Sequence, residues 1–152
     1  MKVLELFSGT HSVGKVCKEL GYEVVSLDMI LPADIQTNIM DWDYKSVFKQ
    51  GDFDIVWGSP PCTEYSALKN CWLGRKLKNG EIFTREQLEL NRNEADKLVL
   101  KVFEIIDYFK PKYYFVENPG GKGGLKSREI MKDKHFVDCD YCKYCDWGYK
   151  KR

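Results

Sequence analysis

Two apolar runs, each ending in a chemically reactive residue, constrain the fold of this chain most. Residues 53–62 (FDIVWGSPPC) and 113–119 (YYFVENP) are short and rich in β-branched and aromatic residues, which predicts a buried strand in each. Open α/β sheets bind their ligands outside the carboxyl ends of the strands. Cys62 and Glu117 are therefore expected at strand ends, with a thiol and a carboxyl group facing one crevice.

The rest of the chain alternates between strand and helix patterns. Helical spacing or caps predict helices over 13–20, 44–49, 84–110 and around 127–132, and β-type runs predict strands at 2–7, 23–27, 33–39, 112–116 and from His135 to about Tyr141. Thr84-Arg85-Glu86-Gln87 has the form of a capping box at the start of the longest helix. This order predicts an α/β fold, a mainly parallel sheet with helices on both faces.

A long loop is predicted between residues 64 and 83. The segment is rich in Lys, Asn and Gly and shows no clear periodicity. Loops of this length are uncommon inside a compact domain and are usually functional. The loop is therefore a candidate functional element.

Composition limits the class of protein. With 152 residues, of which 43% are apolar, we expect residues 1–152 to form one domain. No apolar run is long enough to span a membrane and no leader pattern is seen, so we expect a soluble, intracellular protein with no membrane partner. The six cysteines are then expected to be reduced.

The distribution of charge is more informative than the net charge of +1. Two groups of cations follow the two reactive residues: Lys69, Arg75, Lys76 and Lys78 after Cys62, and Lys122, Lys126 and Arg128 after Glu117. Basic loops at a crevice are where a phosphate backbone would be held, and simple solvation of the loops is the alternative.

The turn after the first strand indicates a cofactor. Residues 7–14 (FSGTHSVG) are mostly small, and a small turn between a strand and a helix lets backbone N–H groups approach a ligand. Asp28 ends the second strand, where an acid can bind a ribose hydroxyl. The turn lacks the complete three-glycine dinucleotide pattern, so a purely steric role for its glycines stays open.

Five motifs in order give the chain a family resemblance over roughly residues 1–120. They are Leu4-Glu5-Leu6-Phe7-Ser8-Gly9, Ser26-Leu27-Asp28-Met29, Asn38-Ile39, Gly58-Ser59-Pro60-Pro61-Cys62-Thr63-Glu64-Tyr65-Ser66 and Phe115-Val116-Glu117-Asn118. Together they resemble the cytosine-C5 DNA methyltransferases, which use S-adenosylmethionine and have a Rossmann-like methyltransferase fold. The chain looks like a short form of this family, without a separate target-recognition domain.

The resemblance implies roles for particular residues. Cys62 would be the nucleophile that attacks C6 of cytosine and Glu117 the acid at N3, because C5 accepts a methyl group only once it has become an enamine carbon. The cytosine would be flipped from a duplex or taken from a single strand, with loop 64–83 as lid and wedge. The residues implied for S-adenosylmethionine are Phe7, Ser8, Gly9, Thr10, His11, Asp28, Met29, Asn38, Ile39 and Pro61.

The sequence departs from the family pattern at several positions. His11 replaces a motif glycine, Asn38 replaces the usual acid of the adenine pair, and Pro119 replaces the usual valine. These departures resemble the variants of viral or phage members. The missing target-recognition region implies that a protein partner or a further segment supplies target recognition.

Other functions stay open at this point. Ser59-Pro60-Pro61 also resembles the signature of amino-methyltransferases, and the substrate could be RNA. A degenerate or incomplete domain would bind cofactor or nucleic acid without turnover. Cys139, Cys142 and Cys145, with His135, could bind zinc, but their spacing is tighter than that of the usual zinc knuckles, and we expect no metal.

Overall fold

The computed structural model describes residues 1–121 and 123–144, and the chain divides into two compact units. The first unit combines Met1–Pro60 with Leu98–Glu117, and the second combines Pro61–Lys97 with Asn118–Arg152. That residues 1–152 act as one catalytic domain, without a separate target-recognition domain, stays a prediction.

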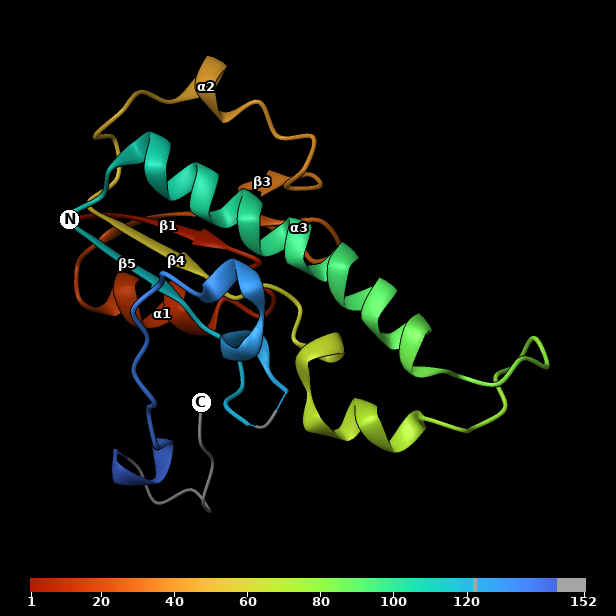
Figure 1. Ribbon diagram of the computed structural model, residues 1–152. Helices are drawn as coiled ribbons and strands as arrows, with labels where there is room; N and C mark the ends of the chain where they lie inside the picture. Colours follow the sequence, from red (N-terminus) through yellow and green to blue (C-terminus); the bar gives the residue numbers. More distant parts are fainter. Residues whose placement is uncertain (122, 145–152) are drawn as a thin grey trace. The chain divides into compact units, whose positions relative to one another are not determined.

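The first unit is built on a five-stranded parallel sheet (Figure 1). Its strands, in the order in which they lie, are β3 (Ile35–Gln36), β2 (Glu23–Asp28), β1 (Lys2–Leu6), β4 (Ile55–Gly58) and β5 (Tyr113–Val116). The chain runs outward from β1 to β3, and then starts again on the other side of β1 with β4 and β5. The strand order therefore reverses between β1 and β4, and ligands bind at this kind of switch point in open α/β sheets.

Helices cover both faces of the sheet, as predicted. Helix α1 (Ser12–Glu19) connects β1 to β2, and α3 (Arg85–Phe109) precedes β5. Parallel crossovers are right-handed, and these two cross the sheet in opposite directions, so α1 and residues 98–109 of α3 lie on opposite faces (Figure 1). A Cβ at Gly58 would lie 2.8 Å from Cγ1 of Val102, so glycine is what allows α3 to pack this closely on β4.

Aromatic side chains fill much of the core of the first unit. The rings of Phe53 and Phe109 are 4.9 Å apart between centroids, and those of Tyr44 and Phe109 are 5.7 Å apart. Tyr44 begins the short helix α2 (Tyr44–Val47), and its hydroxyl donates to Glu104 at 2.6 Å. This cluster fixes the end of α3 from which the chain continues to β5.

The run from Tyr113 forms the predicted strand, but the prediction that this strand is buried is wrong. Its aromatic residues Tyr113, Tyr114 and Phe115 are 47%, 52% and 49% exposed. The reason is the strand order: β5 lies at the edge of the described sheet, and has a neighbouring strand on one side. An apolar run indicates that a strand forms, but not which strands surround it.

The segments outside the sheet also differ from their predictions. Residues 33–39 form only the two-residue β3, and residues 135–141 form no strand in the part of the chain that the structure describes. Phe136 and Val137 are exposed, so burial does not drive strand formation there. In the predicted capping box the Gln87 N–H donates to Thr84 Oγ1, but the Gln87 side chain bonds Asn91.

Short 3₁₀-helices take the place of several loops. Two of them, η1 (Thr63–Tyr65) and η2 (Ala67–Trp72), lie in or beside the segment predicted to be a long loop. The helix predicted around 127–132 is divided into η3 (Leu125–Ser127) and η4 (Glu129–Met131), and η5 (Tyr141–Lys143) follows. Among the described residues, no helix has the length and apolarity that crossing a membrane requires.

Candidate active site

The turn between β1 and α1 has an unusual backbone. Phe7, Gly9 and His11 have φ angles of 58°, 52° and 59°, in the left-handed region that residues other than glycine rarely adopt. Two non-glycine residues in this conformation within five positions store strain, and strain of this kind is concentrated at ligand sites. The backbone therefore marks the same turn that the sequence predicts to contact the cofactor.

Asp28 ties this turn to the end of β2. Its Oδ2 accepts the backbone N–H of Gly9 at 2.9 Å, and its Oδ1 accepts those of Ile30 and Leu31 at 2.8 and 2.9 Å. Burial alone would raise the pKa of Asp28, but the hydrogen bonds from Leu31, Gly9 and Ile30 outweigh it and hold the pKa below its ordinary value. Asp28 is therefore a carboxylate at neutral pH.

The groups at this turn fit the adenosine part of a methyl donor. A carboxylate has about four acceptor positions, and Asp28 uses three, so one remains for a ribose hydroxyl. The Ser8 Oγ is buried and has no hydrogen-bond partner among the described residues, which leaves a polar atom for a ligand. Both residues lie at the carboxyl ends of their strands, next to the point where the strand order reverses.

The other residues predicted to bind the cofactor differ in their exposure and contacts. Ile39 is buried in the core, whereas the Met29 side chain is exposed. Asn38 Oδ1 accepts the N–H of Met40 at 3.1 Å, within its own turn. The Thr10 hydroxyl is exposed and lies 3.2 Å from that of Ser12. Pro61 belongs to the second unit.

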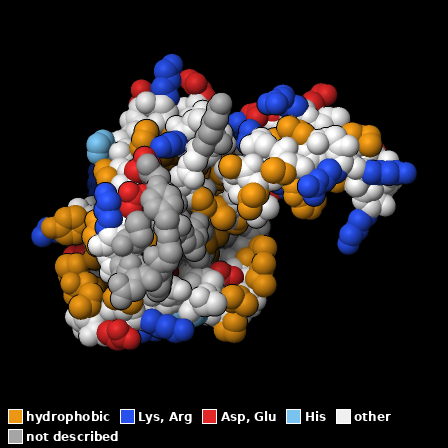
Figure 2. Space-filling model, turned by 90° about the horizontal axis from the view of Figure 1, so that it is seen from below, with side chains coloured by type: hydrophobic (Ala, Val, Ile, Leu, Met, Phe, Trp, Pro, Cys, Tyr) orange, Lys and Arg blue, Asp and Glu red, His pale blue; other side chains and the backbone are white. Residues whose placement is uncertain are grey.

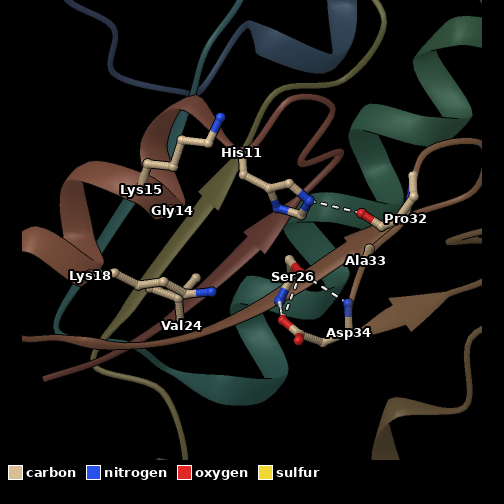
Figure 3. Close-up of a pocket in the computed structure, with 9 residues that line it drawn as sticks. All are labelled: His11, Gly14, Lys15, Lys18, Val24, Ser26, Pro32, Ala33 and Asp34. Atoms are coloured by element: carbon tan, nitrogen blue, oxygen red, sulfur yellow. Dashed lines mark hydrogen bonds between the residues drawn. The ribbon is translucent and has the colours of Figure 1, made fainter.

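A pocket of about 380 Å³ lies beside this turn, between α1 and β2 (Figure 3). His11 is the predicted site residue that lines it, and its Nε2 donates to the Pro32 carbonyl at 2.8 Å. Farther along the pocket, Asp34 accepts the hydroxyl of Ser26 at 2.6 Å. Ser8 and Asp28 are not among the residues that line it, so this pocket is distinct from the groups at the carboxyl ends of β1 and β2.

The end of β5 carries Glu117. Its backbone N–H donates to the Gly58 carbonyl at 2.8 Å, which continues the pairing of β5 with β4 by one residue. Glu117 is half-buried and follows directly after the last strand residue. On the neighbouring strand the Trp57 Nε1 donates to the Ser59 hydroxyl at 2.6 Å, which orders the chain where it leaves the sheet.

Cys62 lies near the start of the second unit. It immediately precedes η1 with φ −93° and ψ 0°, in the sparsely populated bridge region where many active-site residues are found. Its carbonyl accepts the N–H groups of Tyr65 and Ser66 at 3.1 and 3.0 Å. The thiol is free and half-buried. The two hydrogen bonds fix the backbone of the predicted nucleophile relative to η1.

A buried polar network holds η1 in turn. The Tyr65 hydroxyl donates to Asp96 Oδ1 at 2.8 Å, and Arg128 donates to Asp96 Oδ2 through Nε and Nη2 at 3.0 and 2.8 Å. Arg128 also pairs with Glu89. Burial, with the hydrogen bond to Asp96, raises the pKa of Tyr65 far above its ordinary value, so the phenol stays a donor. The network connects the Cys62 segment to the first half of α3.

The network has no counterpart among the sequence predictions. Asp96 is only 8% exposed, and it lies in α3 between Ala95 and Val99, two apolar residues of the helix. A carboxylate beside the apolar face of a helix is rarely buried without a partner. The position of Asp96 in the sequence could therefore have predicted a buried polar contact. The sequence could not show that the partners are Tyr65 and Arg128, 31 and 32 positions away.

Removing the Tyr65 hydroxyl should measure the strength of this network. Tyr65→Phe leaves the ring in place and deprives Asp96 of a buried donor, so we expect the free energy of unfolding to fall by about 1–3 kcal/mol. Urea denaturation followed by circular dichroism would measure this, with Tyr144→Phe, at an exposed tyrosine, as the matched control. Equal stability of the two variants would contradict a stabilising role for the hydroxyl.

The cations expected at the crevice do not all remain available for phosphates. Lys69 Nζ pairs with Glu64 at 2.9 Å, and Lys126 Nζ pairs with Asp138 at 3.2 Å. Arg128 is committed to Asp96 and Glu89. Of the group after Glu117, both described members are therefore engaged within the protein, and Lys122 lies outside the described residues.

The cysteines give no indication of a metal or a disulfide in the described part of the chain. Cys17, Cys62, Cys71 and Cys139 are free thiols. Among the residues whose side chains the structure describes, which do not include Cys142, no cluster of His, Cys, Asp and Glu is arranged to hold a metal ion. The zinc alternative requires Cys142 and Cys145, whose side chains lie outside that set.

The parallel sheet with its switch point, the strained turn after β1 and the acid at the end of β2 define a Rossmann-like methyltransferase fold. The chain matches the family model of the C-5 cytosine-specific DNA methylases over residues 1–135. It is 39% identical, over 153 aligned positions, to a protein of Frog virus 3 (isolate Goorha) described as a probable DNA (cytosine-5)-methyltransferase; the alignment covers 100% of this chain and 68% of the viral protein. The chain therefore belongs to the C-5 cytosine-specific DNA methylase family.

Membership confirms the family resemblance predicted from the five motifs, and with it the enzyme class. The family consists of methylases specific for C5 of cytosine in DNA, which agrees with the predicted DNA substrate. That the relative is viral agrees with the viral character inferred from the departures at His11 and Asn38.

Proposed function

We propose that this protein transfers a methyl group from S-adenosylmethionine to C5 of cytosine in DNA through a covalent adduct between Cys62 and C6. The supporting observation is the position of the two reactive residues in a chain of this family. Glu117 directly follows β5, and Cys62 lies shortly after the end of β4, the parallel neighbour of β5 beside the switch point. The segment that leads to Cys62 thus leaves the sheet at the end where Glu117 is found.

The chemistry assigns each residue one task. The Cys62 thiolate attacks C6, and a bond from sulfur to C6 forms while Glu117, in its protonated form, stabilises the ring at N3. The electrons of the C5–C6 double bond then become available at C5. S-adenosylmethionine, when bound, would supply the methyl group as an electrophile and would leave as the thioether S-adenosylhomocysteine. Transfer of the C5 proton to a water molecule then re-forms the C5–C6 double bond, breaks the bond from sulfur to C6 and releases the Cys62 thiolate.

The turn residues hold the methyl donor in this proposal. Asp28 accepts a ribose hydroxyl at its remaining position, and the Ser8 hydroxyl supplies a further polar contact. The φ angle of Gly9 is 52°, a conformation that strains residues with a Cβ, so glycine is favoured at this position. The absence of a side chain also lets the ligand come close to the backbone. The residues that complete the set carried over from the family motifs are Phe7, Thr10, His11, Met29, Asn38, Ile39 and Pro61.

The product decides between this function and the alternatives. We expect DNA incubated with the purified chain and S-adenosylmethionine bearing a deuterated methyl group to yield labelled 5-methyl-2′-deoxycytidine, detected by mass spectrometry after digestion to nucleosides. Labelled N4-methyl-2′-deoxycytidine would instead support an amino-methyltransferase, and label only in RNA would support an RNA enzyme. Cofactor binding in calorimetry without any labelled nucleoside would support a domain that does not turn over.

A further inference from the structure

Arg92, in the first half of α3, is a largely buried cation. Lysine and arginine side chains are spread over the surface of the molecule that Figure 2 shows. The Arg92 side chain, in contrast, is only 11% exposed. Burying a cation costs free energy unless its N–H groups find acceptors. The contacts of this guanidinium therefore indicate what it does.

Arg92 holds the segment that follows Cys62. Its Nε donates to the Glu64 carbonyl at 3.1 Å. The N–H groups of the next two residues, Tyr65 and Ser66, donate to the Cys62 carbonyl. The backbone from Cys62 to Ser66 is thus a closed turn, and Arg92 is bonded to the middle of it. All five residues belong to the second unit.

The glycine-rich loop that follows Glu117 packs against the same turn. A Cβ at Gly124 would lie 3.6 Å from the Tyr65 carbonyl oxygen, so the backbone of the loop comes close to η1. A Cβ at Gly123 would lie 3.7 Å from Arg92 Nη2. Arg92 therefore lies beside both of the segments that lead away from the two proposed reactive residues.

One nitrogen of Arg92 is unused. Its Nη1 lies 3.8 Å from Glu89 Oε2, and Glu89 is shared with Arg128. Its Nη2 is buried and has no hydrogen-bond partner among the residues that the structure describes. Buried donors without an acceptor are rare in folded proteins. The Nη2 group, beside Gly123, therefore points to an acceptor that it bonds in another state of the site.

We propose that Arg92 is a positioning residue for the methyl transfer. Its guanidinium aligns the Cys62 segment with the loop after Glu117, and its Nη2 donates to a backbone carbonyl of that loop once a cytosine occupies the site. A guanidinium presents five N–H donors in a fixed plane, so one side chain can bond two segments at once. The proposal rests on the proposed function, because the alignment serves the attack by Cys62.

Arg92→Lys tests the alignment. Lysine keeps the charge but replaces the planar fork with a single nitrogen. A misplacement of about 1 Å can cost about 10²-fold in rate, so covalent trapping of DNA containing 5-fluorocytosine, at saturating cofactor and DNA, should slow by about 10²-fold. The calorimetric affinity for S-adenosylmethionine should stay parental. A trapping rate within a few-fold of the parental one would overturn the proposal.

The matched control is Arg85→Lys, at an exposed arginine on the same helix, which should keep the parental trapping rate. Chemical rescue then separates positioning from stability. Millimolar guanidinium should raise the trapping rate of Arg92→Ala several-fold, whereas methylammonium should not, because it lacks the fork. Equal rates with and without guanidinium would contradict the proposal. If the alanine variant does not fold, the rate of Arg92→Lys decides.

Hydrogen exchange followed by mass spectrometry tests the role of Nη2. In the trapped complex of the parent, the peptide that contains Gly123 should exchange its amide hydrogens more slowly than in the free protein, because the new hydrogen bond lowers local opening. This protection should be smaller in the trapped complex of Arg92→Lys. The same exchange in the free and the trapped parent would refute the role of Nη2.

Exchange without DNA separates this proposal from the proposed function. The Tyr65 and Ser66 N–H groups should exchange faster in free Arg92→Lys than in the free parent, because the turn that they close is no longer held. A parent that traps no DNA but shows this difference would refute the function and support the hold of Arg92 on the turn. A parent that traps DNA no faster than Arg92→Lys would leave the function intact and refute the positioning role.

Discussion

Replacing Cys62 with serine is expected to abolish methylation and the covalent trapping of DNA. In the proposed mechanism the thiolate forms the bond to C6 on which every later step depends, and a serine hydroxyl is a far weaker nucleophile. An oligonucleotide with 5-fluorocytosine should trap the parent in the presence of cofactor, because the fluorine on C5 does not leave as a proton does. The trapped complex is measured as a shifted band on a denaturing gel.

The matched control for this substitution is Cys71→Ser. Cys71 is a free, exposed thiol on η2, in the same compact unit as Cys62, so the control changes the same atom at a site without a proposed role. It should keep both trapping and turnover. Trapping by the Cys62 variant at the level of the control would assign the nucleophile to another residue.

Replacing Glu117 with glutamine is expected to lower the rate of methylation by about 10²–10⁴-fold, the range that a positioned acid contributes. Glutamine keeps the size of the side chain and can donate a hydrogen bond, but it cannot hold or release the proton at N3. The Glu117 backbone N–H that bonds the Gly58 carbonyl is unchanged, so the pairing of β5 with β4 should persist. Single-turnover rates with saturating cofactor and DNA would measure the loss.

Cofactor affinity and stability provide the controls for Glu117→Gln. Calorimetric titration with S-adenosylmethionine should give the parental affinity, because the residues proposed to hold it lie mainly on the turn after β1 and at the end of β2. Glu129→Gln, at an exposed carboxylate of η4, should leave the rate unchanged. A Glu117 variant that works within a few-fold of the parental rate would exclude the acid role.

For β5, the sequence predicts the strand conformation but not the burial of its side chains. The run from Tyr113 to Val116 indicated a strand correctly, since aromatic and β-branched residues favour that conformation locally. Its burial depends on which strands pair with it, and the pairing with β4 alone leaves Tyr114 half exposed. Strand order is a property of the whole sheet, which a local pattern does not encode.

The segment after Cys62 was the least predictable part of the candidate site. Its Lys- and Gly-rich composition indicated a loop, whereas the structure contains η1, η2 and a hairpin. The hairpin of residues 74–83 is held by backbone hydrogen bonds and by the burial of Phe83. Its sequence lacks the alternation of apolar and polar residues that predicts a β-hairpin. Its order depends on contacts with residues such as Lys69, which the composition of the segment does not reveal.

The sequence by itself determined the family, the α/β class and the candidate residues Cys62, Glu117 and Asp28, because strand and helix periodicities and motif order are local features of the chain. Only the tertiary structure decided the strand order, the strained turn at Phe7 and His11, and the burial of Asp96. The reason is physical: burial and hydrogen bonding depend on residues far apart in the sequence, and their free energy becomes available only when the fold brings those residues together.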